Sequence, residues 1–237
     1  MKKLISNRRI QDSNCLVVGG AGFIGSHLID ELIKLGANKI IVIDNLFLGS
    51  KKNIKSHIKK NKVDFFIEDA EKINKISFIF DKYEIDNVFN CATKALNNSF
   101  QYPSDTFSVN TNIMLNLLEL LRKKKYKTLC HFSTSEIFGT SQHEKIDENH
   151  LLDPTTTYAA GKAAADLALT SYVKMFNIDA FIVRPFNNYG PRQNYKGNLA
   201  GVIPKTIFRI LSSQEPIIQG TGNQTREFIY VKDTARI

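Results

Sequence analysis

The sequence has little cysteine and no pattern of residues that would hold a metal ion. Its three cysteines, Cys15, Cys91 and Cys130, are odd in number, far apart and each within an apolar, strand-like run. Buried free thiols fit this pattern better than disulfides or metal ligands do. The five histidines show no zinc-ligand spacing. We therefore predict three unpaired cysteines and no metal site.

Long apolar runs are also missing. No run approaches the roughly 18–20 residues of a membrane span, and the basic start of the chain lacks the apolar core of a signal peptide. We therefore predict a cytoplasmic protein with no membrane partner. Residues 1–14 are expected to form a polar lead-in to the first strand.

Acidic residues are fewer than basic ones, 23 against 32, and the formal net charge is +9. Such a charge is typical of proteins that bind nucleic acids. The basic residues fall in solvated runs such as 122–125, however, without the interleaved aromatic residues of an RNA-binding surface. The sequence therefore predicts no nucleic-acid partner, although its positive potential would favour an anionic small substrate.

Short β-rich runs alternate with helical patterns as far as residue 186, which is typical of a parallel sheet covered on both faces. The expected strands span residues 15–18, 39–43, 65–67, 88–89, 127–132 and 180–183, and the expected helices span 26–35, 111–121 and 158–176. Beyond them we expect a loop over 187–192, where turn formers are dense, a helix over 202–211 and a strand over 228–231. The predicted fold is α/β, a doubly wound parallel sheet (Rossmann) over residues 1–186. Residues 187–237 would start a smaller substrate lobe, which we expect to be truncated because a new helix begins near the last residue.

Three glycines, Gly19, Gly22 and Gly25, stand between the first predicted strand and helix. Glycines at this spacing permit a tight turn and let the backbone approach a pyrophosphate at the helix N-terminus. Asp44 lies 19 residues after Gly25, at the end of the second predicted strand. There a carboxylate would accept hydrogen bonds from the ribose hydroxyls of NAD and repel the 2′-phosphate of NADP. An ordinary strand-to-helix turn remains the alternative for the glycines alone, whereas strand, helix and acid together favour NAD.

Tyr158 and Lys162 lie four residues apart on a predicted helix and project from one face of it. A cationic lysine there would lower the pKa of the phenol, so that it could act as a base near neutral pH. Thr134 and Glu136, at the end of the preceding strand, add a hydroxyl and a carboxyl group. Each residue has a plainer interpretation: Thr134 could simply end its strand, Lys162 could be solvated, and Glu136 could be a surface carboxylate.

The order and spacing of these motifs resemble those of the extended short-chain dehydrogenase/reductases, in the NAD-dependent nucleotide-sugar epimerase/dehydratase family. The likeness runs from about residue 14 to the last residue. It is carried by the glycine turn, Ser133-Thr134-Ser135-Glu136, Tyr158-x-x-x-Lys162, Arg184-Pro185-Phe186-Asn187 and Arg226-Glu227-Phe228-Ile229-Tyr230-Val231. The resemblance implies that bound NAD acts as a catalyst on a nucleotide sugar. Tyr158 would take a proton from a sugar hydroxyl, usually at C4, Lys162 would hold the nicotinamide ribose, and Thr134 would hydrogen-bond the same sugar hydroxyl.

The resemblance also implies further contacts. The residues expected at NAD, besides the glycines and Asp44, are Phe23, Ile24, Asn45, Asp69, Ala70, Ala92, Asn110, Ser133, Tyr158, Lys162 and Pro185. Asp69 ends the third predicted strand. It would either contact the adenine ring or simply cap that strand. The residues expected at the substrate are Lys94, Thr134, Ser135, Asn187 and Arg226. Many relatives have His-Leu-Ala-Ala where this chain reads Asn90-Cys91-Ala92-Thr93-Lys94; Lys94 would either meet a substrate carboxylate or phosphate, or face solvent.

Glu136 bears on the class of reaction. In this family a 4-epimerase needs only the hydroxyl residue, the tyrosine and the lysine, whereas 4,6-dehydratases and uronate decarboxylases carry an additional acid. Thr134-Ser135-Glu136 therefore favours a dehydratase or decarboxylase slightly over an epimerase. A non-catalytic NAD-sensing regulatory or scaffold protein on the same fold is the alternative. In relatives of this kind two such helices pair with those of a second copy, so the resemblance implies a homodimer formed through the apolar faces of residues 111–121 and 163–173. The alternative is that these faces simply cover the sheet.

Overall fold

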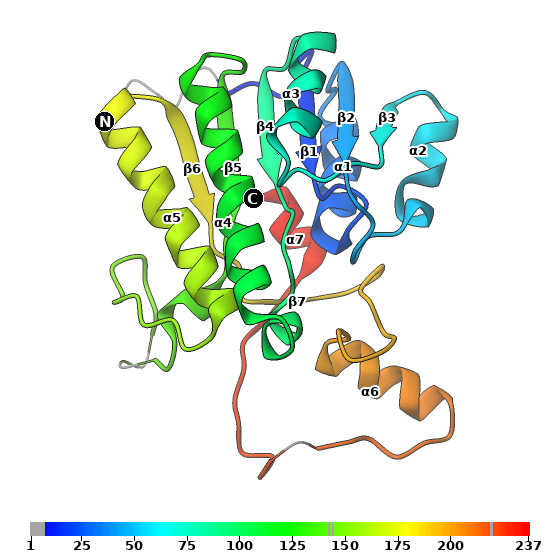
Figure 1. Cartoon of the computed structure of the whole chain (residues 1–237). Helices are drawn as coiled ribbons and strands as arrows, with labels where there is room; N and C mark the ends of the chain where they lie inside the picture. Colours follow the sequence, from blue (N-terminus) through cyan, green and yellow to red (C-terminus); the bar gives the residue numbers. More distant parts are fainter. Residues whose placement is uncertain (1–7, 142, 144, 219) are drawn as a thin grey trace.

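The computed structural model describes residues 8–141, 143, 145–218 and 220–237. Its main feature is a sheet of six parallel strands in the order β3-β2-β1-β4-β5-β6 (Figure 1). The strands are β1 (Asn14–Val18), β2 (Lys39–Ile43), β3 (Val63–Phe66), β4 (Asn87–Asn90), β5 (Thr128–Phe132) and β6 (Asp179–Val183). The order reverses between β1 and β4, and this confirms the predicted doubly wound parallel sheet.

The central strands are buried and mostly apolar because both faces of the sheet are covered, with polar residues such as Asn90 and His131 at a few positions. Successive side chains point to opposite faces. Leu16 and Ile41 pack into one buried cluster, and their neighbours Val17 and Val42 pack into the other. This alternation gives the protein two apolar cores, one on each side of the sheet.

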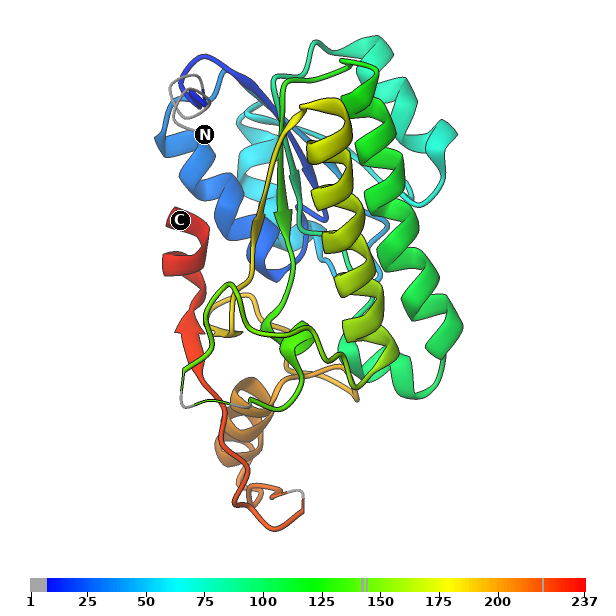
Figure 2. The ribbon, with the colours of Figure 1, turned by 90° about the vertical axis from the view of Figure 1, so that its left-hand side faces the viewer.

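Helices form the two outer layers. Figure 2 shows α4 and α5 on one side of the sheet and α1 and α7 on the other. The helices on the first side are α3 (Ile73–Lys82), α4 (Pro103–Arg122) and α5 (Thr157–Phe176). Those on the second side are α1 (Phe23–Lys34), the short α2 (Lys55–Lys59) and α7 (Val231–Arg236). The 3₁₀ helices are η2 (Lys51–Ile54), η3 (Leu96–Phe100) and η4 (Ser135–Phe138).

Several elements differ from the sequence-based expectation, among them the short α2, which was not expected. Helix α3 was not expected, and α4 begins eight residues before residue 111, with Pro103 in its first turn. Proline is tolerated there because its missing N–H would have no partner in the helix. Residues 187–192 were expected to be loop, yet Asn187–Tyr189 forms strand β7 beside β8 (Phe228–Tyr230). Long-range pairing overrides the turn-forming composition at this point.

The two helices after residue 186 lie in different parts of the molecule. Helix α6 (Val202–Leu211), orange in Figure 1, lies away from the sheet, whereas α7 returns to pack against α1. Val231, Thr234 and Ala235 of α7 are buried by that packing. The boundary at residues 186/187 stays a prediction, and the final helix lies with the nucleotide-binding layers.

The three cysteines are free, as predicted, with Cys15 and Cys130 buried and Cys91 half-buried. Burial raises the pKa of all three thiols. Of the helices in the described part of the chain, none combines the length and apolar character that crossing a bilayer would need.

Candidate active site

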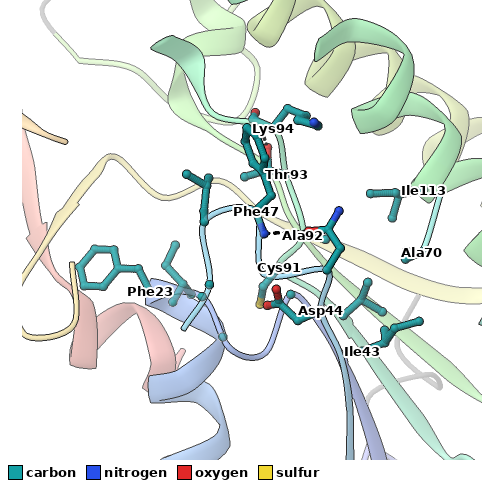
Figure 3. Close-up of a pocket in the computed structure, with 18 of the residues that line it drawn as sticks. Phe23, Ile43, Asp44, Phe47, Ala70, Cys91, Ala92, Thr93, Lys94 and Ile113 are labelled. Carbon is teal, nitrogen blue, oxygen red and sulfur yellow. Dashed lines mark hydrogen bonds between the residues drawn. The ribbon is translucent and has the colours of Figure 1, made fainter. Parts of the chain in front are cut away.

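A cavity of about 280 Å³ opens at the carboxyl ends of β1, β2 and β4. This is where the strand order reverses, and open α/β sheets bind their ligands at such a point. Figure 3 shows side chains from several elements converging on the cavity. Its lining includes the predicted cofactor residues Gly19, Gly22, Phe23, Ile24, Gly25, Asp44, Asn45, Asp69, Ala70 and Ala92, and the predicted substrate residue Lys94.

The glycine turn is tightly packed against the end of β4. Gly19 has φ +77°, and a Cβ added there would lie 2.6 Å from the backbone nitrogen of Ala92. A Cβ on Gly25 would lie 2.4 Å from the carbonyl oxygen of Gly19. Gly22 caps α1 without a side-chain hydrogen bond, which leaves the first N–H groups of the helix available to a ligand. The turn is therefore shaped to admit a phosphate group close to the backbone.

The Asp44 side chain lies at the floor of the cavity (Figure 3). Its carboxylate accepts hydrogen bonds from the backbone N–H of Ala21 at 3.0 Å and of Leu46 at 2.8 Å. Burial raises the Asp44 pKa, and these backbone donors oppose that rise. A carboxyl group with a raised pKa becomes protonated at a higher pH than usual. We therefore expect Asp44 to lose its ability to accept hydrogen bonds from the ribose hydroxyls as the pH falls.

Asp44→Asn is expected to weaken NAD binding about tenfold and to narrow the preference for NAD over NADP. The amide keeps the shape of the side chain but removes the charge, and a hydrogen bond to a charged group is worth about 1.5–3 kcal/mol. Titration calorimetry with both dinucleotides measures the effect. Asp86→Asn is the matched control, because Asp86 pairs with Lys127 and the Asn14 N–H at the opposite ends of the strands. Equal NAD affinity in Asp44→Asn and the parent protein would contradict the assignment.

Asp69 and Asn45 meet at the edge of the cavity beyond β3. The Asn45 amide donates to the Asp69 carboxylate at 3.3 Å, and that carboxylate also accepts from the Glu71 N–H at 3.0 Å. The second bond is the local cap that the plainer interpretation of Asp69 predicts. Since Asp69 also lines the cavity, its adenine contact stays a prediction that is compatible with the cap.

Tyr158 lies in the first turn of α5, half-buried beside the end of β5. Burial raises the pKa of its phenol, while hydrogen bonds with the hydroxyls of Thr134 and Thr93 lower it. The negative charge of Glu136 raises this pKa further. The structure thus brings together three of the predicted catalytic residues, Thr134, Glu136 and Tyr158, and Thr93 joins them to the cavity wall.

Lys162 is buried one turn further along α5, and its ammonium donates to the carbonyl of Phe132 at 2.7 Å. Burial lowers its pKa to about 8, and the negative charge of Asp166 acts in the opposite direction. The expected lowering of the Tyr158 pKa by Lys162 is absent here, because the ammonium donates to the Phe132 carbonyl. The two threonine hydroxyls lower this pKa, but burial outweighs them and the Tyr158 pKa is raised. Lowering by Lys162 stays a prediction for the site that holds NAD.

Asn110 of α4 organises the wall of the cavity next to Tyr158. Its side-chain oxygen accepts from the Lys94 N–H at 2.8 Å and from the Thr93 hydroxyl at 3.1 Å. The Lys94 ammonium lies 3.9 Å from the centre of the Phe47 ring and 3.4 Å from the Asp105 carboxylate. In Figure 3 Lys94 and Phe47 lie together above the cavity. Lys94 therefore does not project freely into solvent, and its contact with a substrate group stays a prediction.

The other predicted substrate residues lie outside the cavity lining. Ser135 begins η4, and its N–H donates to the carbonyl of Pro185 at 3.2 Å. The Asn187 amide donates to the Glu227 carbonyl at 3.2 Å. Arg226 is exposed and donates to the carbonyl of its neighbour Thr225. Their contacts with a substrate stay predictions.

The structure adds residues that the sequence motifs did not indicate. Phe47, Cys91 and Arg192 line the cavity, together with Thr93, which the resemblance had already placed with Ala92 at the nicotinamide-side wall. Arg192 also holds the chain after β7 against α1, through an ion pair with Asp30 at 2.9 Å. Phe47 and Cys91 are close in sequence to predicted site residues, so proximity was a usable signal. Nothing in the sequence brings Arg192 to the glycine turn, because a long-range contact places it there.

Comparisons with known proteins agree with this geometry. The model of the NAD dependent epimerase/dehydratase family matches residues 15–237. A Methanocaldococcus jannaschii protein named "Putative UDP-glucose 4-epimerase" is 36% identical over 223 residues, which cover 93% of this chain and 70% of that protein. UDP-glucuronic acid decarboxylase 6 of Arabidopsis thaliana is 33% identical, and the match covers 96% of this chain and 64% of the relative. A solved dTDP-glucose 4,6-dehydratase from Streptomyces venezuelae, with NAD bound, is 27% identical with a TM-score of 0.86; the match covers 94% of this chain and 70% of that one.

The chain belongs to the NAD-dependent epimerase/dehydratase family. NAD is the cofactor of this family, and the residues of this member fit it. The turn at Gly19–Gly25 would hold the pyrophosphate at the N-terminus of α1, and Asp44 would accept from the ribose hydroxyls. Ser133 and Lys162, at the carboxyl end of β5 and on α5, would hold the nicotinamide end. The reaction that this family member carries out is a separate question.

Proposed function

We propose that this chain carries the cofactor-binding and catalytic part of an enzyme that acts on a nucleotide-diphosphate sugar through transient oxidation at C4. The observation that carries the proposal is the grouping of Thr134, Glu136 and Tyr158 beside the cavity. A phenol that hydrogen-bonds with a hydroxyl group can act as the base that removes the proton of a sugar hydroxyl, and the nearby carboxylate adds a second acid–base group. The relatives named above act on nucleotide sugars, which supports the same class of substrate here.

In the proposed reaction each side chain has one task. NAD, when bound, supplies the acceptor and donor for hydride. The Tyr158 oxygen takes the proton of the sugar hydroxyl, and the Thr134 hydroxyl holds that same sugar oxygen in place. The Lys162 ammonium donates hydrogen bonds to the nicotinamide ribose. We place the diphosphate of the substrate at Asn187 and Arg226, since a guanidinium binds such groups through paired hydrogen bonds.

Glu136 leads us to favour 4,6-dehydration or uronate decarboxylation over 4-epimerisation. Both reactions need an additional acid or base after the oxidation, and Glu136 lies near enough to Tyr158 to influence the phenol by its charge. The dehydratase and decarboxylase among the relatives agree with this order. The M. jannaschii relative is named as a putative 4-epimerase, and this favours 4-epimerisation, the second candidate reaction. The non-catalytic NAD sensor finds no support among these relatives.

We further propose that the active protein is a homodimer formed through α4 and α5, with residues 187–237 contributing to a substrate lobe. Phe107 and Leu115 of α4 and Leu167 of α5 are exposed apolar side chains. Pairing of these helices with those of a second copy would bury them. Light scattering of the purified protein tests the assembly, and a monomer at all concentrations would contradict it.

The test of function is incubation of the protein with NAD and a panel of UDP-, dTDP-, GDP- and CDP-sugars. Mass spectrometry then reads the products. Loss of water indicates dehydration, loss of carbon dioxide indicates decarboxylation, and an unchanged mass with altered retention indicates epimerisation. Binding of NAD with every sugar nucleotide left unchanged would contradict the proposed enzyme.

A further inference from the structure

A buried polar network lies beneath the predicted nicotinamide end of the site, and it centres on Asp166. Asp166 is 1% exposed and follows Lys162 by four residues on α5. Residues spaced four apart share a helix face, so Tyr158, Lys162 and Asp166 line up along the side of α5 that meets the sheet. A carboxylate this deeply buried needs partners on both oxygens.

One oxygen of Asp166 is fully occupied. Oδ2 accepts from the Ser133 hydroxyl at 2.9 Å and from Nε of Arg184 at 2.9 Å. Burial raises the pKa of Asp166, and the Arg184 charge and the Ser133 hydrogen bond lower it. The two donors therefore favour the ionised carboxylate, and in return that carboxylate fixes the rotamer of Ser133, a predicted contact of NAD.

The other oxygen faces a histidine. Oδ1 of Asp166 lies 3.6 Å from Nε2 of His131, and neither buried atom has a hydrogen-bond partner in the described structure. The Asn90 amide nitrogen lies 3.2 Å from Nδ1 of His131, and the Asn90 oxygen accepts from the Ala92 N–H at 3.3 Å. Asn90 must then donate to Nδ1, so the proton of the neutral imidazole is on Nε2 and points at Asp166.

We propose that Asp166 is a positioning residue for the cofactor site, which holds Ser133 in place and provides the counter-charge for Lys162. It touches neither the cavity nor any reacting atom, and it acts through these two side chains. The inference rests on the proposed roles of Ser133 and Lys162 at NAD but is independent of the sugar and of the reaction class.

The charges around Lys162 determine what the loss of Asp166 would do. Burial lowers the Lys162 pKa to about 8, and Asp166 and Cys91 are the groups that raise it. Of the other groups packed here, His131 is neutral because burial holds its pKa well below the usual range, and Arg184 is paired with Asp166. Without Asp166 the Lys162 pKa falls further, and the ammonium is lost at a lower pH.

The test measures NAD affinity by calorimetry between pH 6 and pH 9 for the parent protein, Asp166→Asn and Asp166→Glu. We expect Asp166→Asn to bind as well as the parent at pH 6 and about fivefold more weakly at pH 8. A nearby opposite charge shifts a pKa by about one unit or more. A fall of that size in the Lys162 pKa accounts for the fivefold ratio. Asp166→Glu should restore most of the affinity at pH 8. Asp64→Asn is the matched control, because Asp64 pairs with Lys39 and Tyr83 at β3, away from the cavity.

A second measurement does not require NAD. The titration of Lys162, followed by NMR at its side-chain carbon next to the nitrogen and assigned with Lys162→Arg, should have a lower midpoint in Asp166→Asn. The oxygen of the asparagine can still accept from the Ser133 hydroxyl, so Asp166→Asn removes the counter-charge and keeps the contact with Ser133. An unchanged midpoint in the folded variant, or an equal loss of affinity at every pH, would therefore overturn the proposal and leave Asp166 a structural role. If the parent protein bound no NAD, the cofactor site would be wrong, whereas the Lys162 titration would still decide the role of Asp166.

The amide introduced by Asp166→Asn would place its N–H groups against Nε2–H of His131, and this conflict could unfold the single variant. The double variant Asp166→Asn with His131→Phe removes the opposing donor. The same two measurements apply to it, with thermal melting as the check on folding. Failure of both variants to fold would assign Asp166 to stability and overturn the positioning role.

Discussion

Tyr158→Phe is expected to lower turnover of the sugar nucleotide by about 10²–10⁴-fold while NAD affinity changes little. The substitution removes the oxygen that we propose takes the hydroxyl proton, and it keeps the ring at the start of α5. The hydroxyls of Thr134 and Thr93 stay in place but cannot replace it as a base at neutral pH. Steady-state kinetics on the substrate identified in the panel, together with NAD titration, measures both quantities.

The pH dependence of the parent enzyme gives the same prediction a second readout. Burial and Glu136 raise the Tyr158 pKa above its ordinary value. The phenol is therefore protonated at neutral pH, and turnover that depends on the phenolate rises as the pH rises. Tyr172→Phe on the same helix is the control, since the Tyr172 hydroxyl donates to Glu119 at 2.8 Å, outside the site. If Tyr158→Phe retained the turnover of Tyr172→Phe, the proposed mechanism would be wrong.

Gly19→Ala is expected to weaken NAD binding about a hundredfold. The new Cβ would lie 2.6 Å from the Ala92 nitrogen, and the three atoms nearest to it all belong to the backbone. The turn and the end of β4 must then separate by roughly 1 Å, and a misplacement of that size is enough to cost a factor of about 10² in a preorganised site. Calorimetry with NAD measures the loss.

The control for this variant is Gly36→Ala. Gly36 has φ +78°, close to that of Gly19, but a Cβ there would meet only the side chain of Gln11 at 3.4 Å. Both variants carry the cost of a left-handed backbone, about 1–2 kcal/mol of folding stability, and urea unfolding reports it. Only Gly19→Ala should also lose NAD. Equal NAD affinity in the two variants would show that the close approach to Ala92 does not shape the site.

The sequence by itself determined the architecture and the order of the motifs. Apolar strands buried on both faces alternate with helices, and this pattern has few solutions other than a doubly wound sheet. The glycine spacing and Asp44 lie in one short strand–helix–strand unit, so local geometry was enough to predict a dinucleotide site there. Tyr158 and Lys162 share a helix face for the same local reason.

Tertiary structure decided which groups act on these residues. Thr93, from the end of β4, reaches Tyr158 only because β4 and β5 are neighbours in the sheet. Arg192 reaches α1 because the chain after β7 folds back over it. Asp166 of α5 acquires its role from Ser133, His131 and Arg184. His131 lies in β5, Ser133 directly follows β5, and Arg184 directly follows β6. A spacing of four and eight residues from Lys162 and Tyr158 places Asp166 on the right face, but burial and these contacts give its carboxylate a function, since a charge is influential only where water is excluded.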